Sequence, residues 1–336
     1  MKNKRIRARI IALIALVFIL LPQTTGQSQF SYDTYFPLIQ NHQQIGVDTA
    51  NRAVSLDFFQ TNYRIENPPS INWSGSHKNC DPGTTSPAFQ QAVLQRINYF
   101  RAMAGVPAEV SFSNESNLRA QAAALLMSVN GALSHNPPQT WACYASIAYE
   151  GASSSNLYLG VYGWDAITGY MRDPGDGNYP VGHRRWILHP QTKIMGSGDI
   201  PPVTGYWPSN ALLVFDEHMW EPRPPTRDGF VAWPPPGHVP YSVVFARWSF
   251  SYPWADFNTA TVSMSQAGET VPIVKAKVVS GYGENTLVWQ ITGMDCGQNW
   301  PRPNQDTRYT ININNVIIDD QPHEFNYDVI VFDPYH

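Results

Sequence analysis

Apolar residues recur at helical spacing soon after residue 86. Ser86 offers an N-cap, Pro87 suits the first helical position, and Gly105 follows the last apolar residue. The apolar positions between them are Phe89, Val93, Ile97, Phe100 and Ala104. Steps of three and four residues place these side chains on one face of a helix, so the pattern predicts a helix that begins at Pro87.

Further elements follow in the same part of the chain. We expect a second helix over Ser116–Asn130, where Gly131 ends the apolar pattern, and a third over Gly163–Asp173. Short β-type runs come next, at Lys193–Ile200 and Ala211–Phe215. Helices interleaved with a few strands predict a layered α/β or α+β domain, and we take the fold class as α+β.

The hydrophobic pattern changes after residue 220. Residues 221–240 hold seven prolines, which is typical of a stiff extended linker. Beyond them apolar and polar residues alternate, as at Tyr309, Ile311 and Ile313. Several such short strands with turn residues between them predict an all-β, immunoglobulin-like sandwich over residues 241–336.

The N-terminus has the pattern of a secretory signal peptide. Five basic residues precede the apolar run Ile10–Leu21, and small or polar residues follow it. The run is shorter than the roughly 20 residues of a membrane-spanning helix, which disfavours an uncleaved anchor. We therefore expect a leader at residues 1–26, a secreted protein without a membrane span, and an extended, irregular segment at 27–85.

Charge and composition exclude some classes of protein. Lys and Arg number 22 against 26 Asp and Glu, and removal of the leader leaves 17 basic residues and a net charge of −9. An acidic chain is unsuited to binding nucleic acid. A hydrophobic content of 43% can bury a core, which excludes a disordered chain.

The three cysteines suggest one bridge. Cys80 lies just before the first helix, and Cys143 lies in a long loop expected over residues 132–155. We pair these two, because the bridge would clamp the loop against the helices. Cys296 is then left free in the C-terminal domain.

Candidate chemistry is dispersed along the chain. No His-Glu-x-x-His, Gly-x-Ser-x-Gly or paired-cysteine zinc motif is present in the sequence. What remains is His135 after the second helix, Ser155, Asp173 at the end of a helix, and His183 at a turn. Two imidazoles with a carboxylate and a hydroxyl can hold a divalent metal or transfer a proton. The alternative is structural, with both imidazoles bonded to loop carbonyls.

Four segments in order resemble the CAP superfamily of cysteine-rich secretory, antigen 5 and pathogenesis-related proteins. They are Asn98-x-x-Arg101-x-x-x-Gly105, Leu133-Ser134-His135, Ser155-Asn156-Leu157 and Gly182-His183-Arg184-Arg185-Trp186-Ile187-Leu188. The chain is most similar to the bacterial secreted branch. The resemblance covers roughly residues 86–217, and we place a CAP-like domain at 86–220.

The resemblance implies an α-β-α sandwich whose cleft holds two histidines and two acidic residues, often with a divalent metal. By position the histidines are His135 and His183. Ser155 replaces one acid, so metal affinity is expected to be lower. The second acid corresponds to Asp173, while Glu150 is an alternative that could reach the same space.

Three hypotheses for function follow. The first is extracellular binding of a small or lipidic ligand, or of a cell-surface partner, with no required cofactor and an optional zinc-like ion between His135 and His183. The second is an extracellular hydrolase of peptidase or esterase type that uses the same cleft, although a non-enzymatic role is favoured. The third is an adhesive or polysaccharide-binding protein that acts through the β-sandwich.

Overall fold

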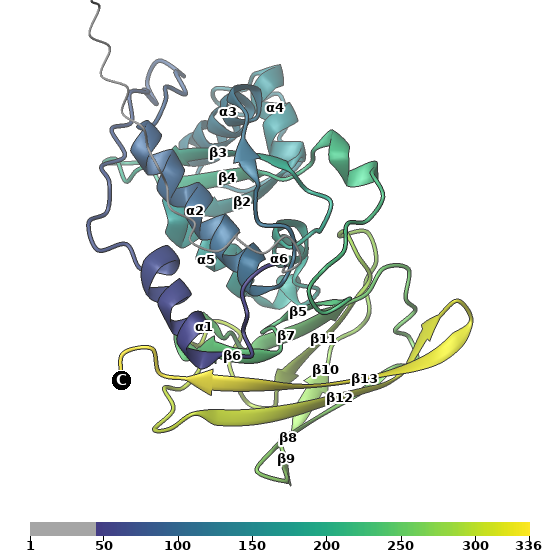
Figure 1. Cartoon of the computed structure of the whole chain (residues 1–336). Coiled ribbons are helices and arrows are strands. Elements are labelled where there is room, and N and C mark those ends of the chain that lie inside the picture. The colour runs from purple at the N-terminus through teal and green to yellow at the C-terminus, as the bar shows by residue number, and fades with distance from the viewer. Residues whose placement is uncertain (1–44) are drawn as a thin grey trace, which may run out of the picture. The chain divides into compact units, whose positions relative to one another are not determined.

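A mixed four-stranded sheet lies at the centre of the N-terminal domain (Figure 1), in the computed structural model that describes residues 45–336. The leader predicted at residues 1–26 lies outside the described residues. The strand order is β1-β3-β4-β2. Their bounds are β1 Ser111–Phe112, β2 Ser155–Leu159, β3 Ile194–Ile200 and β4 Ser209–Leu213.

Helices cover both faces of this sheet. One face carries α3 Asn114–Asn130 and α4 Ser146–Ser153, and the other carries α2 Pro87–Met103 and α5 Gly163–Arg172 (Figure 1). The α-β-α sandwich is therefore confirmed, together with the three predicted helices. Ser113 caps α3 through its side chain, so this helix begins two residues before the predicted Ser116.

Two glycines let α3 approach the sheet closely. Gly196 and Gly198 lie on one face of β3, and a Cβ at either would overlap the backbone of α3 at Ser116 and Ala120. Alternate residues of a strand point to the same face. The Gly-x-Gly pattern in β3 thus allows the backbone of α3 to lie close to the sheet, on the face opposite α5.

Three short α-helices and one π-helix in the described residues were not predicted. The expected extended segment 27–85 contains α1 Arg52–Phe58, capped by Asn51, and a π-helix at Phe59–Tyr63. The expected loop 132–155 contains α4, and the expected turn at His183 is the first part of α6 Gly182–Ile187. Phe58 and Phe59 are buried, so tertiary packing stabilises a segment whose polar sequence gave no periodic signal.

Two sheets pack face to face in the C-terminal part, which confirms the β-sandwich. Their orders are β10-β11-β7-β5 and β6-β13-β12-β8-β9. Trp248 and Tyr309, from opposite sheets, have ring centroids 5.9 Å apart, and Phe250 and Phe325 4.8 Å apart. The bounds are β5 Val231–Trp233, β6 Gly237–Pro240, β7 Arg247–Ser251, β8 Thr261–Gln266, β9 Glu269–Thr270, β10 Ile273–Lys275, β11 Thr286–Ile291, β12 Thr307–Ile318 and β13 Gln321–Phe332.

The proline-rich range 221–240 is not a free linker. It supplies β5 to one sheet and β6 to the other, where β6 pairs in parallel with β13. Trp233 is fully buried between Phe100 of α2 and Phe245. Proline is tolerated at sheet edges, and both strands lie at an edge. Of the seven prolines only Pro240 lies in a strand, and the others lie in the segments before β5 and between β5 and β6.

Buried arginines join the two domains. Arg184 of α6 donates to the carbonyl oxygens of Met171 at 2.7 Å and Arg247 at 2.8 Å, and to Ser249 Oγ at 3.1 Å. In return Arg247 of β7 donates to the carbonyl oxygens of Asp173 and Gly175, at 2.7 and 2.9 Å. Both side chains are buried, so the contact excludes water and fixes α6 and the end of α5 against the sandwich.

A third buried arginine, Arg101, binds the segment that follows α6. Arg101 of α2 donates to four carbonyl oxygens, those of Pro107, Ile187, His189 and Thr192. Burial lowers the pKa of its guanidinium to about 9. The side chain therefore remains charged at neutral pH and holds the chain between α6 and β3 against α2.

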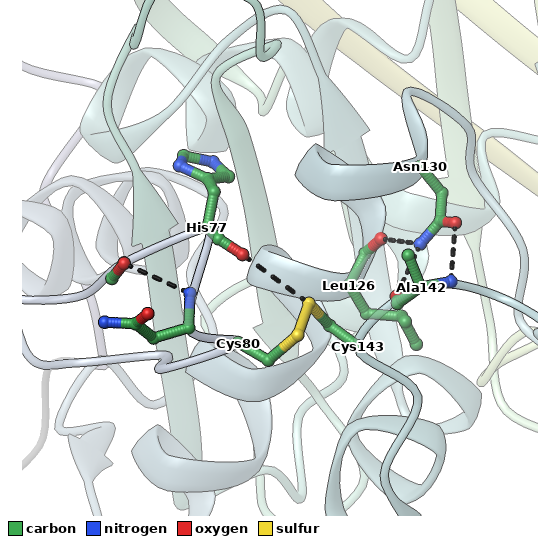
Figure 2. Close-up of a disulfide and its surroundings, with 8 residues drawn as sticks. His77, Cys80, Leu126, Asn130, Ala142 and Cys143 are labelled. Carbon is green, nitrogen blue, oxygen red and sulfur yellow. Dashed lines mark hydrogen bonds between the residues drawn. A yellow bond between two sulfur atoms is a disulfide. The ribbon is translucent and has the colours of Figure 1, made fainter.

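The predicted disulfide is confirmed. Cys80 and Cys143 are bonded (Figure 2), and Cys143 lies close to the carbonyl of His77. Asn130 at the end of α3 holds the same loop by bonding Leu126 O and Ala142 N. Cys296 is a free thiol, as expected. Within residues 45–336, no helix has the length and hydrophobicity needed to cross a bilayer.

We expect Arg184→Met to lower the free energy of unfolding by about 2–4 kcal/mol, because three buried acceptors lose their donor. Chemical denaturation of the full chain measures this loss. Arg308→Met is the control, since Arg308 is exposed and pairs only with Asp328 on the surface; its effect should stay below about 1 kcal/mol. Equal effects of the two substitutions would contradict the role given to Arg184.

Candidate functional site

Asp173 fixes the imidazole of His183. Asp173 ends α5 in the left-handed conformation, with φ of 53°, and its side chain is fully buried. Its Oδ2 accepts from the backbone N–H of His183 at 3.0 Å, and its Oδ1 lies 2.7 Å from His183 Nδ1. A carboxylate accepts, so Nδ1 carries the proton. In the neutral ring Nε2 then keeps its lone pair.

His135 is oriented in the same way by a backbone carbonyl. It follows α3 in the loop that the disulfide clamps, and its Nδ1 lies 3.0 Å from the carbonyl oxygen of Ala152. A carbonyl oxygen only accepts, so Nδ1 is again the protonated nitrogen. Two imidazoles from distant parts of the sequence therefore have the same tautomer when neutral, with Nε2 free of these contacts.

Both imidazoles line two adjoining cavities, with volumes of about 380 and 300 Å³. The first cavity has mainly apolar and aromatic walls, made by Leu133, Leu157, Leu159, Tyr158 and Tyr170. The second is more polar and includes Ser155, Asn156, Trp186 and Tyr282. A molecule bound here would meet apolar walls on one side and the imidazoles where the cavities join.

The other residues predicted for the site differ in position. Ser155 begins β2, and its buried Oγ has no hydrogen-bond partner among residues 45–336. Asp173 lines the first cavity, but both of its oxygens bond His183. Glu150 is exposed and lies 3.8 Å from Arg119, and it lines neither cavity, so it does not replace the missing acid.

The sandwich contributes to the cleft, which sequence reasoning missed. Tyr282 lines the second cavity, and its ring packs so closely on Gly182 that a Cβ there would lie 2.8 Å from it. Arg185 holds this loop by donating to the carbonyl oxygens of Val279 and Glu284, both at 2.9 Å. No sequence signal identified this contact, because arginines are usually exposed.

The neutral phenol of Tyr170 packs against the imidazole of His183. The ring centroid of Tyr170 lies 5.4 Å from that of the imidazole. Its hydroxyl has three acceptors within hydrogen-bond distance, which are Asn156 O, Asn210 O and Asn210 Oδ1. Burial raises the pKa of Tyr170 well above its ordinary value. The phenol therefore stays protonated, and it adds no charge to the cleft.

The two histidines share one feature of metal ligands. A histidine that binds metal usually donates its other N–H to a carboxylate or carbonyl, as His135 and His183 both do. Asp173 acts as the orienting partner, so it is not itself a ligand. No cluster of three or more His, Cys, Asp or Glu suited to a metal occurs in the described part of the chain. Water, ligand oxygens or the Ser155 hydroxyl would have to complete the coordination.

We expect Asp173→Asn to reverse the tautomer of His183. The backbone N–H of His183 needs the amide oxygen, which leaves the amide NH₂ facing Nδ1 and moves the ring proton to Nε2. Two-dimensional ¹H–¹⁵N spectra of the histidine rings should show this change, and Co²⁺ affinity should fall by about tenfold or more.

Asp216→Asn is the matched control for this experiment. Asp216 Oδ1 accepts from Nδ1 of His218 at 2.8 Å, and its Oδ2 accepts from the backbone N–H groups of Lys193 and Ile194. Neither Asp216 nor His218 lines the two cavities. The substitution should change the His218 ring and leave His183 and Co²⁺ binding unaltered. An unchanged His183 tautomer in Asp173→Asn would show that the carboxylate does not orient the imidazole.

Comparisons with known proteins were made for the whole chain. Residues 94–200 match the sequence model of CAP, the cysteine-rich secretory protein family. No curated protein matches the chain. Among solved structures, PcoC, a methionine-rich copper resistance protein from Escherichia coli, aligns with 13% identity over 30% of this chain and 92% of its own, with a TM-score of 0.23. The selenomethionine form of PcoC aligns with 13% identity over 30% of this chain and 94% of its own, with a TM-score of 0.22. Similarity this low supports no argument about function.

Proposed function

Because residues 94–200 match the CAP family model, we propose that this chain is a secreted CAP-family protein whose cleft binds a small or lipidic ligand. The observation that carries the proposal is the pair of imidazoles with fixed tautomers. His135 and His183 each donate Nδ1–H to a protein acceptor, and both line the same two cavities. Such a pair offers two acceptor nitrogens in one partly apolar space.

The walls of the cleft favour an amphipathic ligand. Leu133, Leu157 and Leu159 line the first cavity, and Leu133 is 48% exposed although it is apolar. An apolar chain would cover this surface. A hydroxyl or another N–H or O–H donor at its end would meet Nε2 of His135 or His183, and Asn156 lines the neighbouring wall.

A divalent metal is an optional part of this proposal. His135 and His183 would hold it through Nε2, with Ala152 O and Asp173 as the groups that orient the two rings. A bound ion would polarise an oxygen of the ligand. Ser155 supplies a hydroxyl where the family resemblance implies an acid, so we expect weak and reversible binding.

The bridge between Cys80 and Cys143 supports the secreted location. Disulfides persist in oxidising compartments, and they are rare in the cytosol. The basic and apolar pattern of residues 1–26 supports the same location, since it is the pattern of a signal peptide.

One observation favours a hydrolase as the second candidate. The Asp173–His183 pair has the arrangement in which a carboxylate holds an imidazole as a general base. Ser155 is a candidate nucleophile that lines the same cavity as both imidazoles, but its Oγ bonds neither of them. We rank this candidate second for that reason. Turnover of ester or peptide libraries that disappears in both His183→Ala and Ser155→Ala would reverse the order.

Native mass spectrometry tests the binding proposal. Protein secreted into the medium, or incubated with a lipid extract and repurified, should carry a small-molecule adduct that denaturation releases. His135→Ala with His183→Ala should reduce the bound fraction by about tenfold, since each removes a polar contact with the ligand. His218→Ala, at an imidazole outside both cavities, should retain it. The absence of an adduct from the unaltered protein in both preparations would contradict the proposal.

A further inference from the structure

The strand β2 is a free edge of the central sheet. The order β1-β3-β4-β2 places it last (Figure 1), and among residues 45–336 it pairs only with β4. Proteins usually protect an edge strand of this length with a lysine, a proline or a bulge. The sequence Ser-Asn-Leu-Tyr-Leu of β2 contains no charged residue and no proline, and its register with β4 is regular. This edge is therefore suited to pairing with a further strand.

The hydrogen bonds at the two ends of β2 show which of its backbone groups face away from β4. Gly160 N donates to Pro208 O at 2.7 Å, and Ser154 O accepts from Val214 N at 3.1 Å. In an antiparallel pair every second residue of a strand bonds the same neighbour. The even-numbered residues from Ser154 to Gly160 therefore bond β4. The odd-numbered residues direct their N–H and C=O groups away from β4, toward the open edge.

The first cavity of the histidine cleft, of about 380 Å³, runs along this edge. Leu157, Tyr158 and Leu159 all line it. Successive side chains of a strand point to opposite faces, so a cavity that contacts three consecutive residues lies beside the strand. Its other walls agree with this position, since Leu133 follows α3 on one face of the sheet and Tyr170 belongs to α5 on the other.

The backbone groups that face this cavity are unpaired. Within the described residues, the N–H and C=O groups of Leu157 and Leu159 have no hydrogen-bond partner. Leu159 is partly exposed, and both residues line the cavity, so a ligand in the cavity meets this part of the strand. The cleft therefore contains a row of free backbone donors and acceptors beside its two imidazoles.

The spacing of these groups identifies the kind of ligand. Leu157 and Leu159 are two residues apart, so their N–H and C=O groups repeat after about 6.7 Å. An extended peptide presents the same groups at the same repeat, and it can pair with both residues at once. A lipid chain has no donors or acceptors along its length, so it would shield these groups from water without bonding them, which costs free energy.

We propose that the ligand of the histidine cleft is an extended peptide that adds a strand to the sheet along β2. This proposal rests on the ligand binding proposed above for the same cleft, and it names the class of ligand. Alternate side chains of the added strand point to the two faces of the sheet. One set meets the exposed side chain of Leu133, and the other meets Tyr170 and Asn178. The peptide should therefore alternate apolar and polar residues.

The edge of a second copy of this chain is the main competing occupant, because free edges also pair with one another. The edge of β2 lies in a cavity with walls on both faces of the sheet. One extended strand can enter such a cavity. The edge of a folded domain, with helices on both of its faces, is too wide to do so. We therefore expect the protein without peptide to sediment as a monomer.

A library of capped heptapeptides that alternate apolar and polar residues tests the proposal with the full-length protein. Fluorescence anisotropy identifies the tightest binder, whose backbone N–H groups are then replaced one at a time by N-methyl groups. Methylation at every second residue should reduce the affinity by about tenfold or more, because these amides bond β2. Methylation at the residues between them should have a much smaller effect. The protein is unaltered in this scan, so its folding does not influence the result.

Leu159→Pro tests the same contact from the side of the protein. The N–H of Leu159 points away from β4, so proline removes a donor of the open edge and leaves the bonds to β4 in place. This variant should lose about tenfold in affinity for the best heptapeptide. Leu159→Ala is the matched variant, since it removes the side chain and keeps the N–H, and it should lose less. Thermal melting checks that both variants are folded.

Three results would each overturn the peptide proposal. They are that no heptapeptide binds, that the effects of N-methylation lack a two-residue period, and that Leu159→Pro binds the peptide as tightly as Leu159→Ala. A dimer that Leu159→Pro dissociates would also overturn it, in favour of a second copy. A lipid adduct in native mass spectrometry without peptide binding would overturn the peptide proposal alone, whereas the absence of both would contradict ligand binding in the cleft as well.

Discussion

The buried hydrogen bonds donated by Arg184 and Arg247 hold the rest of the structure in place. Arg184 extends from α6 into the sandwich, and Arg247 extends from β7 back to the carbonyls of Asp173 and Gly175. Burial lowers the pKa of Arg184 to about 9, which is the electrostatic consequence of removing a guanidinium from water. The acceptors that surround both arginines offset this cost only when both domains are present.

This contact explains why the cleft belongs to both domains. Asp173 and Val181 are both in the left-handed conformation, with φ of 53° and 48°, and they bracket the segment that leads from α5 to α6. A buried β-branched residue such as Val181 adopts this conformation only where its surroundings impose it. Arg247 bonds the carbonyl of Asp173, so the sandwich fixes the backbone that aims the carboxylate at His183. The orientation of one imidazole thus depends on a strand more than sixty residues away.

The longer helices and strands could be predicted from the sequence, because each carries its own pattern of apolar residues and end signals. Short stretches of sequence contain the apolar face of α2, its N-cap at Ser86 and the alternating apolar residues of β12. By contrast, α4 has eight residues and no side-chain cap, and α6 has only six, so packing decides whether they form. The candidate site was predicted as a set of residue types, including His135 and His183. The hydrolase hypothesis also included Asp173 as the group that orients a histidine, but its two hydrogen bonds to His183 depend on a turn that the sequence does not specify.

The most direct test of this account is the ring ¹⁵N spectrum of the histidines in Arg247→Lys. A lysine cannot bond two carbonyls in the planar geometry of the guanidinium. If the sandwich fixes Asp173, the His183 resonances should move towards a mixture of tautomers while those of His218 stay unchanged. Resonances of His183 identical to those of the unaltered protein would contradict the claim that the sandwich orients the cleft.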